Sequence, residues 1–118
     1  MRIGELSAAT GVSARSLRYY EEQRLLVPIR HDANGYREYS PLAVEEVRTI
    51  RLYLALGLST EQIASFLRCV LKNKEAFCSE VLPVYERKLG EIDAQLAQLT
   101  QLRSNLVERI RSIREENE

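Results

Sequence analysis

The fold is decided first by residues 11–22, which have the sequence GVSARSLRYYEE. Gly11 suits a turn that needs positive φ, and Ser13 has the short polar side chain of a helix N-cap. Residues 3–9 have the apolar spacing of a short helix, and a second helix is predicted over about 14–23. Two short helices joined by a tight turn that contains glycine predict a helix-turn-helix.

The second of these helices has one basic and aromatic side. Arg15, Arg18 and Tyr19 share it because they are spaced three or four residues apart. An arginine fork can donate two parallel hydrogen bonds to a phosphate or to a guanine edge, although a purely solvated surface is the alternative. Tyr20 follows Leu17 by three residues, so we expect its ring to pack in the core.

A small β-hairpin is predicted next. Pro28 blocks continuation of the helix, and Asn34-Gly35 is typical of a two-residue type I′ turn in which both residues have positive φ. The flanking residues 29–33 and 36–39 would form two strands. This hairpin would be the wing of a winged helix-turn-helix.

Two further helices and a connector follow the wing. Ser40 as N-cap and Pro41 at the first helical position predict one helix, which ends near Gly57. Ser59, with Gln62 three residues on, is a capping box for a helix over about 60–71. Residues 72–79 would then be a connector.

A long helix is predicted from about residue 80 to 115. Its apolar residues alternate in steps of three and four, which is the heptad spacing of a coiled-coil seam. The seam residues are Leu82, Tyr85, Leu89, Ile92, Leu96, Leu99, Leu106, Ile110 and Ile113. Arg103 occupies one seam position, where a charge costs stability but can fix register. The simplest partner for so long a stripe is a second copy of the chain, so we expect a homodimer.

Four motifs in this order resemble the MerR family of bacterial transcriptional regulators. They are Ile3-Gly4-Glu5-Leu6, Ser16-Leu17-Arg18-Tyr19-Tyr20-Glu21, Asn34-Gly35-Tyr36-Arg37-Glu38-Tyr39 and Gly57-Leu58-Ser59. The resemblance implies a mainly α fold, with a winged helix-turn-helix DNA-binding domain and helix pair at 1–71, a connector at 72–79, and a dimerisation helix at 80–118 that forms an antiparallel coiled coil.

The resemblance also implies a mechanism and a set of DNA contacts. The dimer would bind a near-palindromic promoter operator, distort that DNA, and act with RNA polymerase. Arg15, Ser16, Arg18 and Tyr19 would contact DNA from the recognition helix, as would Tyr36 and Arg37 from the wing. Ser59 would lie where a helix N-terminus favours a phosphate.

The two cysteines, Cys69 and Cys78, leave three interpretations open. They are inert core thiols, or a reversible disulfide or electrophile sensor, or ligands of a metal shared across the dimer. Cys78 matches the position of a thiolate ligand in metal-sensing members, but no Cys or His follows it, so that site is incomplete and no metal or other cofactor is assigned. A disulfide requires the connector to fold back, because the two Cα atoms must approach within about 7 Å.

Composition narrows the function classes. Lys and Arg together number 17, as do Asp and Glu, so the chain has no net charge and DNA binding must rest on a local basic face.

No apolar run is long enough for a membrane span, and the N-terminus lacks a signal peptide's apolar core, so we expect a cytoplasmic protein with no membrane partner. With a single His and no catalytic motif, we predict no enzyme. The alternative to a regulator is an architectural or excisionase-like DNA binder without an inducer, and the effector is not predicted.

Overall fold

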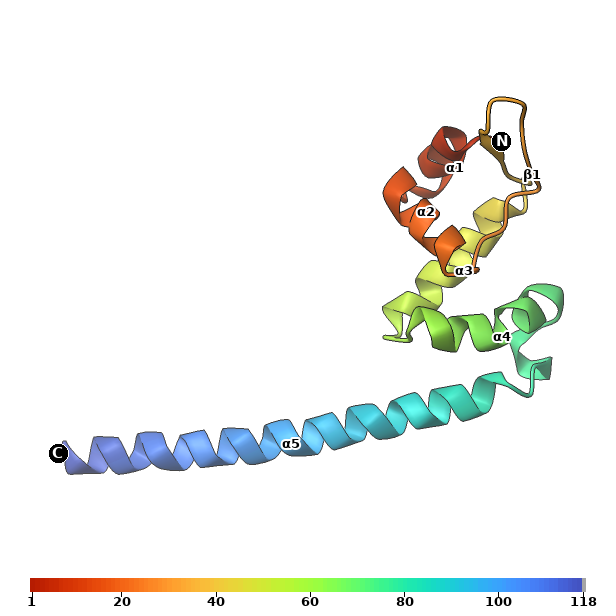
Figure 1. Ribbon diagram of the computed structural model, residues 1–118. Coiled ribbons are helices and arrows are strands. Elements are labelled where there is room, and N and C mark those ends of the chain that lie inside the picture. Colours follow the sequence, from red (N-terminus) through yellow and green to blue (C-terminus); the bar gives the residue numbers. More distant parts are fainter. Residues whose placement is uncertain (118) are drawn as a thin grey trace. The chain divides into compact units, whose positions relative to one another are not determined.

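The computed structural model describes residues 1–117. Its helices and strands are shown in Figure 1 and follow the predicted order. They are α1 (Ile3–Thr10), α2 (Ala14–Glu22), β1 (Arg30–His31), β2 (Arg37–Glu38), α3 (Ala43–Ala55), α4 (Thr60–Lys72), the 3₁₀ helix η1 (Glu75–Phe77) and α5 (Val81–Glu116). The chain forms two compact units, Met1–Leu82 and the residues from Pro83 onward. A mainly α fold with a small wing and a long C-terminal helix is therefore confirmed.

The helix-turn-helix forms as its caps predict. Gly11 ends α1 with φ 74°, and its N–H donates to the Ser7 carbonyl. Ser13 begins α2, because its side chain accepts the N–H of Ser16. Leu6 and Leu17 are fully buried between the helices and the rest of the unit, which fixes the direction in which α2 runs from α1.

The wing turn differs from the predicted two-residue type I′ turn. Gly35 has φ 80°, but Asn34 is not among the non-glycine residues with positive φ. The β1–β2 register pairs His31 with Arg37 and so leaves five residues, 32–36, between the strands. Within them the Asp32 N–H donates to the Tyr36 carbonyl at 2.8 Å, and the Gly35 N–H donates to the Asp32 carbonyl at 2.9 Å. The Asp32 carboxylate explains the difference, because it accepts the N–H groups of Asn34 and Tyr36 and so caps the longer loop. Each strand is also shorter than predicted, at two residues.

The helix pair begins two residues later than predicted. α3 starts at Ala43 rather than Pro41, although the Ser40 hydroxyl still accepts the Leu42 N–H at 3.1 Å. The capping box at the start of α4 is confirmed, with Ser59 and Gln62 each accepting the other's backbone N–H. The pair is joined by an edge-to-face contact between Tyr53 and Phe66, whose ring centroids are 4.9 Å apart.

α5 is a single helix of 36 residues, and the leucines of its predicted seam are exposed. Its leucines are more than half exposed, from 56% at Leu96 to 63% at Leu106. None of the helices in the part of the chain that the structure describes has the length and apolarity to cross a membrane. A helix that leaves this much apolar side chain in water requires a partner to cover it.

Candidate nucleic-acid interface

The predicted recognition residues lie together on one side of α2. Arg15, Arg18 and Tyr19 are exposed, and Tyr19 has 47% of its surface in solvent. Ser16 is half-buried, and its hydroxyl lies 3.1 Å from that of Ser13 at the start of the helix. Tyr20 on the other side is only 7% exposed, which confirms its predicted place in the core. One side of α2 therefore exposes two arginines and a tyrosine, and its other side is buried in the core.

Glu21 joins the wing to α2, and the sequence did not single it out. Its carboxylate accepts the Arg37 Nε–H at 2.7–2.9 Å and the Tyr39 hydroxyl at 3.1 Å. Burial, together with the Glu21 carboxylate, raises the pKa of Tyr39 to about 12, so the phenol stays protonated and keeps donating. The contact uses Nε of Arg37 and leaves the side chain 40% exposed at the surface of the wing. Arg37 is thus held at Nε, and the rest of its guanidinium is at the surface of the wing.

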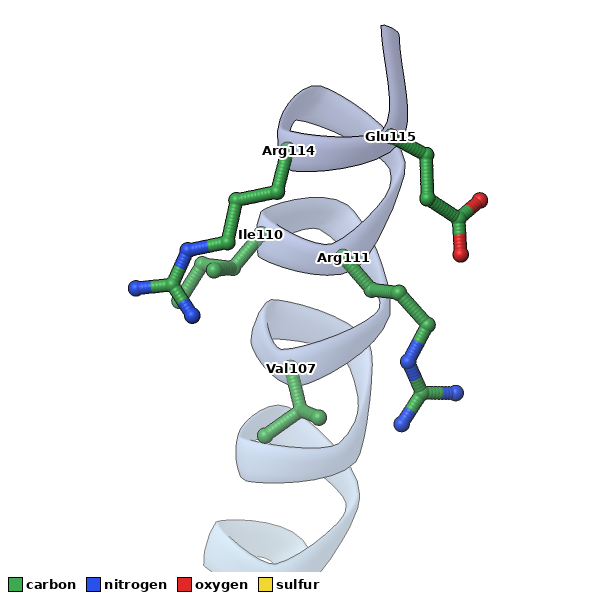
Figure 2. A pocket seen from close by; sticks show the side chains of 5 residues that line it. All are labelled: Val107, Ile110, Arg111, Arg114 and Glu115. Atoms are coloured by element: carbon green, nitrogen blue, oxygen red, sulfur yellow. The ribbon is translucent and has the colours of Figure 1, made fainter. Parts of the chain in front are cut away.

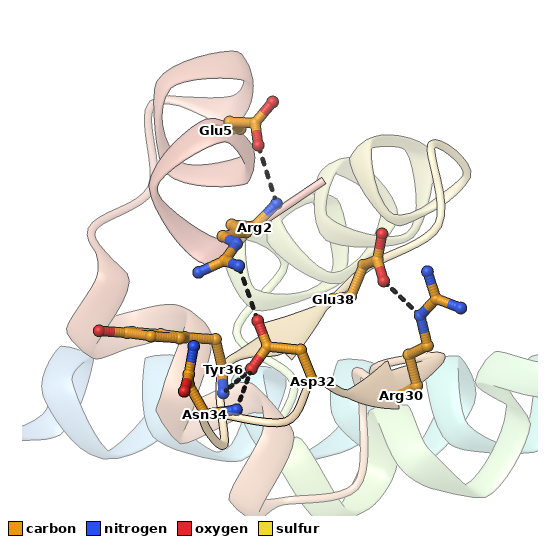
Figure 3. A network of polar contacts seen from close by, with 7 residues as sticks. All are labelled: Arg2, Glu5, Arg30, Asp32, Asn34, Tyr36 and Glu38. Atoms are coloured by element: carbon orange, nitrogen blue, oxygen red, sulfur yellow. Dashed lines mark hydrogen bonds and ion pairs between the residues drawn. The ribbon is translucent and has the colours of Figure 1, made fainter.

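The tip of the wing is tied to the N-terminus by Arg2, as Figure 3 shows. Arg2 donates to the Asp32 carboxylate at 2.6 Å, and its guanidinium lies 4.7 Å from the centre of the Tyr36 ring. Desolvation works against ionisation of Asp32, but hydrogen bonds from the Tyr36 and Asn34 amides and the charge of Arg2 lower its pKa overall. Tyr36 remains 57% exposed, so its ring is oriented by Arg2 without being covered.

Ser59 lies at the start of α4, close to the end of α2. Its hydroxyl accepts the Gln62 N–H at 3.1 Å, and the neighbouring Thr60 hydroxyl donates to the Gln23 side chain at 3.2 Å. Ser59 itself is exposed. The helix N-terminus that we expected to favour a phosphate is therefore linked by a hydrogen bond to the residue that ends the recognition helix.

The predicted dimerisation residues form the exposed stripe of α5. Leu82, Leu89, Leu96, Leu99, Leu106, Ile110 and Ile113 are exposed, and Tyr85 and Ile92 are half-buried. Near the C-terminal end, Val107, Ile110, Arg111, Arg114 and Glu115 line a shallow groove, with the apolar side chains flanked by arginines (Figure 2). One helix alone lines this groove, so the groove is an open side of a packing surface rather than an enclosed site.

Cys69 and Cys78 are joined as a disulfide. Their Cα atoms are 5.9 Å apart, within the limit set by disulfide geometry. The connector does fold back onto α4, as a bridge requires, and η1 within it places Cys78 beside the last turn of the helix. The structure thus brings the two cysteines together, as the disulfide among the three interpretations requires.

Comparison with known families decides the identity of the chain. A family model described as "MerR HTH family regulatory protein" matches residues 1–69, and one described as "MerR, DNA binding" matches residues 44–109. The chain belongs to the MerR family. It is a DNA-binding transcriptional regulator of a family that acts as dimers distorting promoter DNA, and this family is not one of enzymes.

Individual MerR proteins agree with this assignment. The HTH-type transcriptional regulator HmrR of Rhizobium leguminosarum bv. viciae is 35% identical over 90% of this chain and 81% of its own length. PbrR691 of Ralstonia metallidurans CH34, whose crystal structure is a complex with lead(II), superposes with a TM-score of 0.79 at 26% identity over 92% of this chain and 83% of that one. EcmrR, seen with DNA in an EcmrR-RPo assembly, has a TM-score of 0.74 at 25% identity over 100% of this chain and 41% of that one.

A bound metal, as in PbrR691, does not fit the residues that the structure describes here. Both sulfurs that could serve as soft ligands, those of Cys69 and Cys78, are bonded to each other. Within residues 1–117, no three or more His, Cys, Asp or Glu side chains lie close enough to hold a metal ion together.

Proposed function

We propose that the chain binds its operator through α2 and the wing, which act as one rigid surface. The observation that carries this proposal is the Glu21 carboxylate, which holds Arg37 of the wing 2.7 Å away while Arg18 projects from the same helix. Arg15, Ser16, Arg18 and Tyr19 would enter the major groove, where an arginine can read guanine through its paired donors. Tyr36, Arg37 and Ser59 would hold the flanking phosphates.

The exposed stripe of α5 would form the dimer by pairing with the same stripe of a second chain, antiparallel about a two-fold axis. Two copies related by such an axis present two recognition helices to two half-sites, which matches a near-palindromic operator. Deforming the DNA between the half-sites is an energy term that the protein can change without changing its base contacts.

The dimer would act in the cytoplasm with RNA polymerase, at a promoter whose geometry it adjusts, and in response to a signal. The whole of this chain matches part of the EcmrR chain, which was seen with DNA in an EcmrR-RPo assembly, and this match supports action at a promoter.

The test is operator binding by arginine variants of the full chain. In vitro selection from random DNA first provides the operator, and fluorescence anisotropy then measures affinity against salt concentration. Arg18→Ala is expected to weaken the selected site by about 1–3 kcal/mol and to relax its sequence preference, because a base contact is lost. Arg37→Ala is expected to weaken binding to all DNA sequences alike. It should also lower the slope of log affinity against log salt concentration by the amount expected for loss of about one phosphate contact.

The matched control is Arg87→Ala, which removes one positive charge from α5, at a position outside the seam. It should bind operator as the wild type does. If Arg87→Ala and Arg18→Ala weaken binding equally, the effect is one of net charge and the proposed interface is wrong.

A further inference from the structure

The Cys69–Cys78 bridge lies at the junction between the DNA-binding unit and the dimerisation helix. Cys69 is in the last turn of α4, and Cys78 precedes the first residue of α5 by three positions. The Cys78 carbonyl accepts the Val81 N–H at 3.2 Å, so the bridged residue also supports the start of α5. Opening or closing the bridge therefore changes the constraint on the segment that connects the two units.

Backbone hydrogen bonds next to the bridge fix the local geometry of each cysteine within its own segment. Asn73 closes the end of α4 by donating its N–H to the Cys69 carbonyl at 2.8 Å, and its side chain approaches the Cys69 sulfur at 3.9 Å. The Cys78 N–H donates to Glu75 at 3.1 Å within the turn of η1. Two thiols released from this bridge would stay close together, which favours re-formation of the disulfide.

Apart from the bridge and the peptide chain itself, the connector is attached to the helix pair by noncovalent contacts alone. The Tyr53 hydroxyl donates to Glu75 at 3.3 Å, and Cys78 and Val81 are 5% and 3% exposed. Phe77, between them, is 77% exposed. Opening the bridge would remove the covalent cross-link between this short segment and α4, so the connector should gain freedom while the helix-turn-helix keeps its own apolar core.

The bridge is not required to compensate for a poor core. Disulfides stabilise small domains that cannot bury enough apolar surface, whereas this unit buries Leu6, Leu17, Ile50 and Phe66 almost completely. A regulator of promoter DNA works in the compartment where thiols are kept reduced, and bridges formed there are usually transient and redox-sensing. This step rests on the proposed function, since it takes the protein to act on DNA in the cell.

We propose that Cys69 and Cys78 form a thiol–disulfide switch, oxidised by hydroperoxides and reduced by thiols, that supplies the regulator with its signal. One thiolate attacks a peroxide oxygen, the O–O bond breaks, and a sulfenic acid and an alcohol (water, for hydrogen peroxide) form. The second thiolate attacks the sulfenic sulfur, the S–S bond forms and water leaves. The two thiols lose two electrons and two protons, which the peroxide takes up.

Reduction begins when a reductant thiol attacks the more accessible of the two sulfurs. Cys69 is half-buried and Cys78 is buried, so a small thiol reaches the Cys69 sulfur first. The S–S bond breaks, Cys78 leaves as a thiolate, and a mixed disulfide remains on Cys69. A second reductant thiol completes the exchange and is released with the first as their own disulfide.

The experiment compares the full-length wild type in its bridged and reduced forms. Alkylation of free thiols followed by mass measurement defines each form, after hydrogen peroxide and after glutathione. Transcription in vitro from a promoter that carries the selected operator is then measured for both. We expect transcript yield to differ by about fivefold or more between the forms, in the range of ordinary allosteric coupling, and to return when the redox treatment is reversed.

Limited trypsin digestion supplies a local measurement. Lys72 and Lys74 are exposed and lie inside the loop that the bridge closes. Cleavage there should be faster in the reduced protein, whereas cleavage at Arg30 in the wing should be the same in both forms. Equal cleavage at Lys72 and Lys74 in both forms would contradict the proposed release of the connector.

Substitution separates failure of the switch from failure of the proposed function. Cys69→Ser with Cys78→Ser should bind operator but give one transcript yield before and after peroxide. If this variant does not fold, the reduced wild type provides the same comparison without substitution. If both wild-type forms bind operator and direct equal transcription, the switch is wrong and the DNA-binding proposal stands; if neither binds any selected DNA, the proposed function itself fails. A reduced protein whose output changes with Cu(I) or Zn(II) but not with peroxide would also overturn the switch.

Discussion

Leucine side chains belong to the buried core in the first unit of the molecule but form an exposed stripe on α5. Leu6, Leu17 and Leu25 in the first unit are 0% exposed, whereas Leu96 and Leu106 in α5 are 56% and 63% exposed. Burying one leucine contributes about 1.5–3 kcal/mol. In the first unit the chain gains that free energy by folding, but in α5 it can gain it only by association. In the proposed function, the first unit carries the DNA contacts and α5 determines how many copies of it reach the operator together.

The largest effect is expected from charges placed in the seam. Leu89→Glu with Leu96→Glu removes four leucines from each dimer and should raise its dissociation constant by about 10⁴-fold or more. Sedimentation equilibrium measures the association, and operator affinity should fall with it. The control is Ala94→Glu with Gln101→Glu, which adds the same charges on the opposite side of α5. A seam variant that remains dimeric at micromolar concentration would disprove the assignment of the stripe.

One substitution in each unit distinguishes stability gained by folding from stability gained by association. Leu17→Ala should lower the free energy of unfolding by about 3 kcal/mol, because it opens a cavity in a closed core. This loss should not depend on protein concentration. Leu99→Ala should instead make the thermal midpoint depend more steeply on concentration, since it weakens association. If both variants respond to concentration in the same way, the two units do not differ as described.

A smaller effect, in the opposite direction, is expected at Arg103. This residue occupies a seam position otherwise held by apolar side chains, and a charge there costs dimer stability. Arg103→Leu should tighten the dimer by about tenfold, and light scattering should report whether assemblies larger than a dimer appear. Arg87→Leu, outside the seam, is the control and should leave association unchanged. An Arg103→Leu dimer no tighter than the wild type would place Arg103 outside the seam.

The smallest effect tests how the first unit holds its wing. Glu21→Gln keeps the size of the side chain but removes the charge that Arg37 and Tyr39 contact. Because Arg37 is partly exposed, we expect a loss of about 1 kcal/mol, or about fivefold, in operator affinity without loss of the dimer. Glu108→Gln in α5 makes the same charge change elsewhere and should have no effect. Unchanged affinity in Glu21→Gln would mean that the wing is positioned without this contact.

Local signals predicted the helices well, because their caps and spacings act within a few residues. Gly11, Ser13 and Ser59 take the capping roles that their side chains suit. The wing turn was predicted wrongly, because Asn34-Gly35 was considered without the carboxylate of Asp32 two residues before it. The end of α2 was predicted to within one residue, but the positive φ of Arg24, 62°, was not, because glycine is the usual residue there.

The candidate site was predicted as a set of residues but not as an arrangement. Glu21 lies 16 residues from Arg37 along the chain, and Arg2 lies 30 from Asp32, so neither pair follows from periodicity. The cysteine spacing allowed a bridge without requiring one, because only the fold of the connector brings Cys78 back to α4. The exposed stripe of α5, in contrast, was predictable because heptad spacing depends on the helix alone.

The central claim is that α5 pairs two closed DNA-binding units over one operator. Native mass spectrometry of the full chain with the selected operator, joined to hydroxyl-radical footprinting of the same complex, tests it most directly. The account predicts two chains for each duplex and protection of two half-sites related by a two-fold axis, about one helical turn or a multiple apart. One chain for each duplex, with a single unsymmetrical footprint, would contradict it.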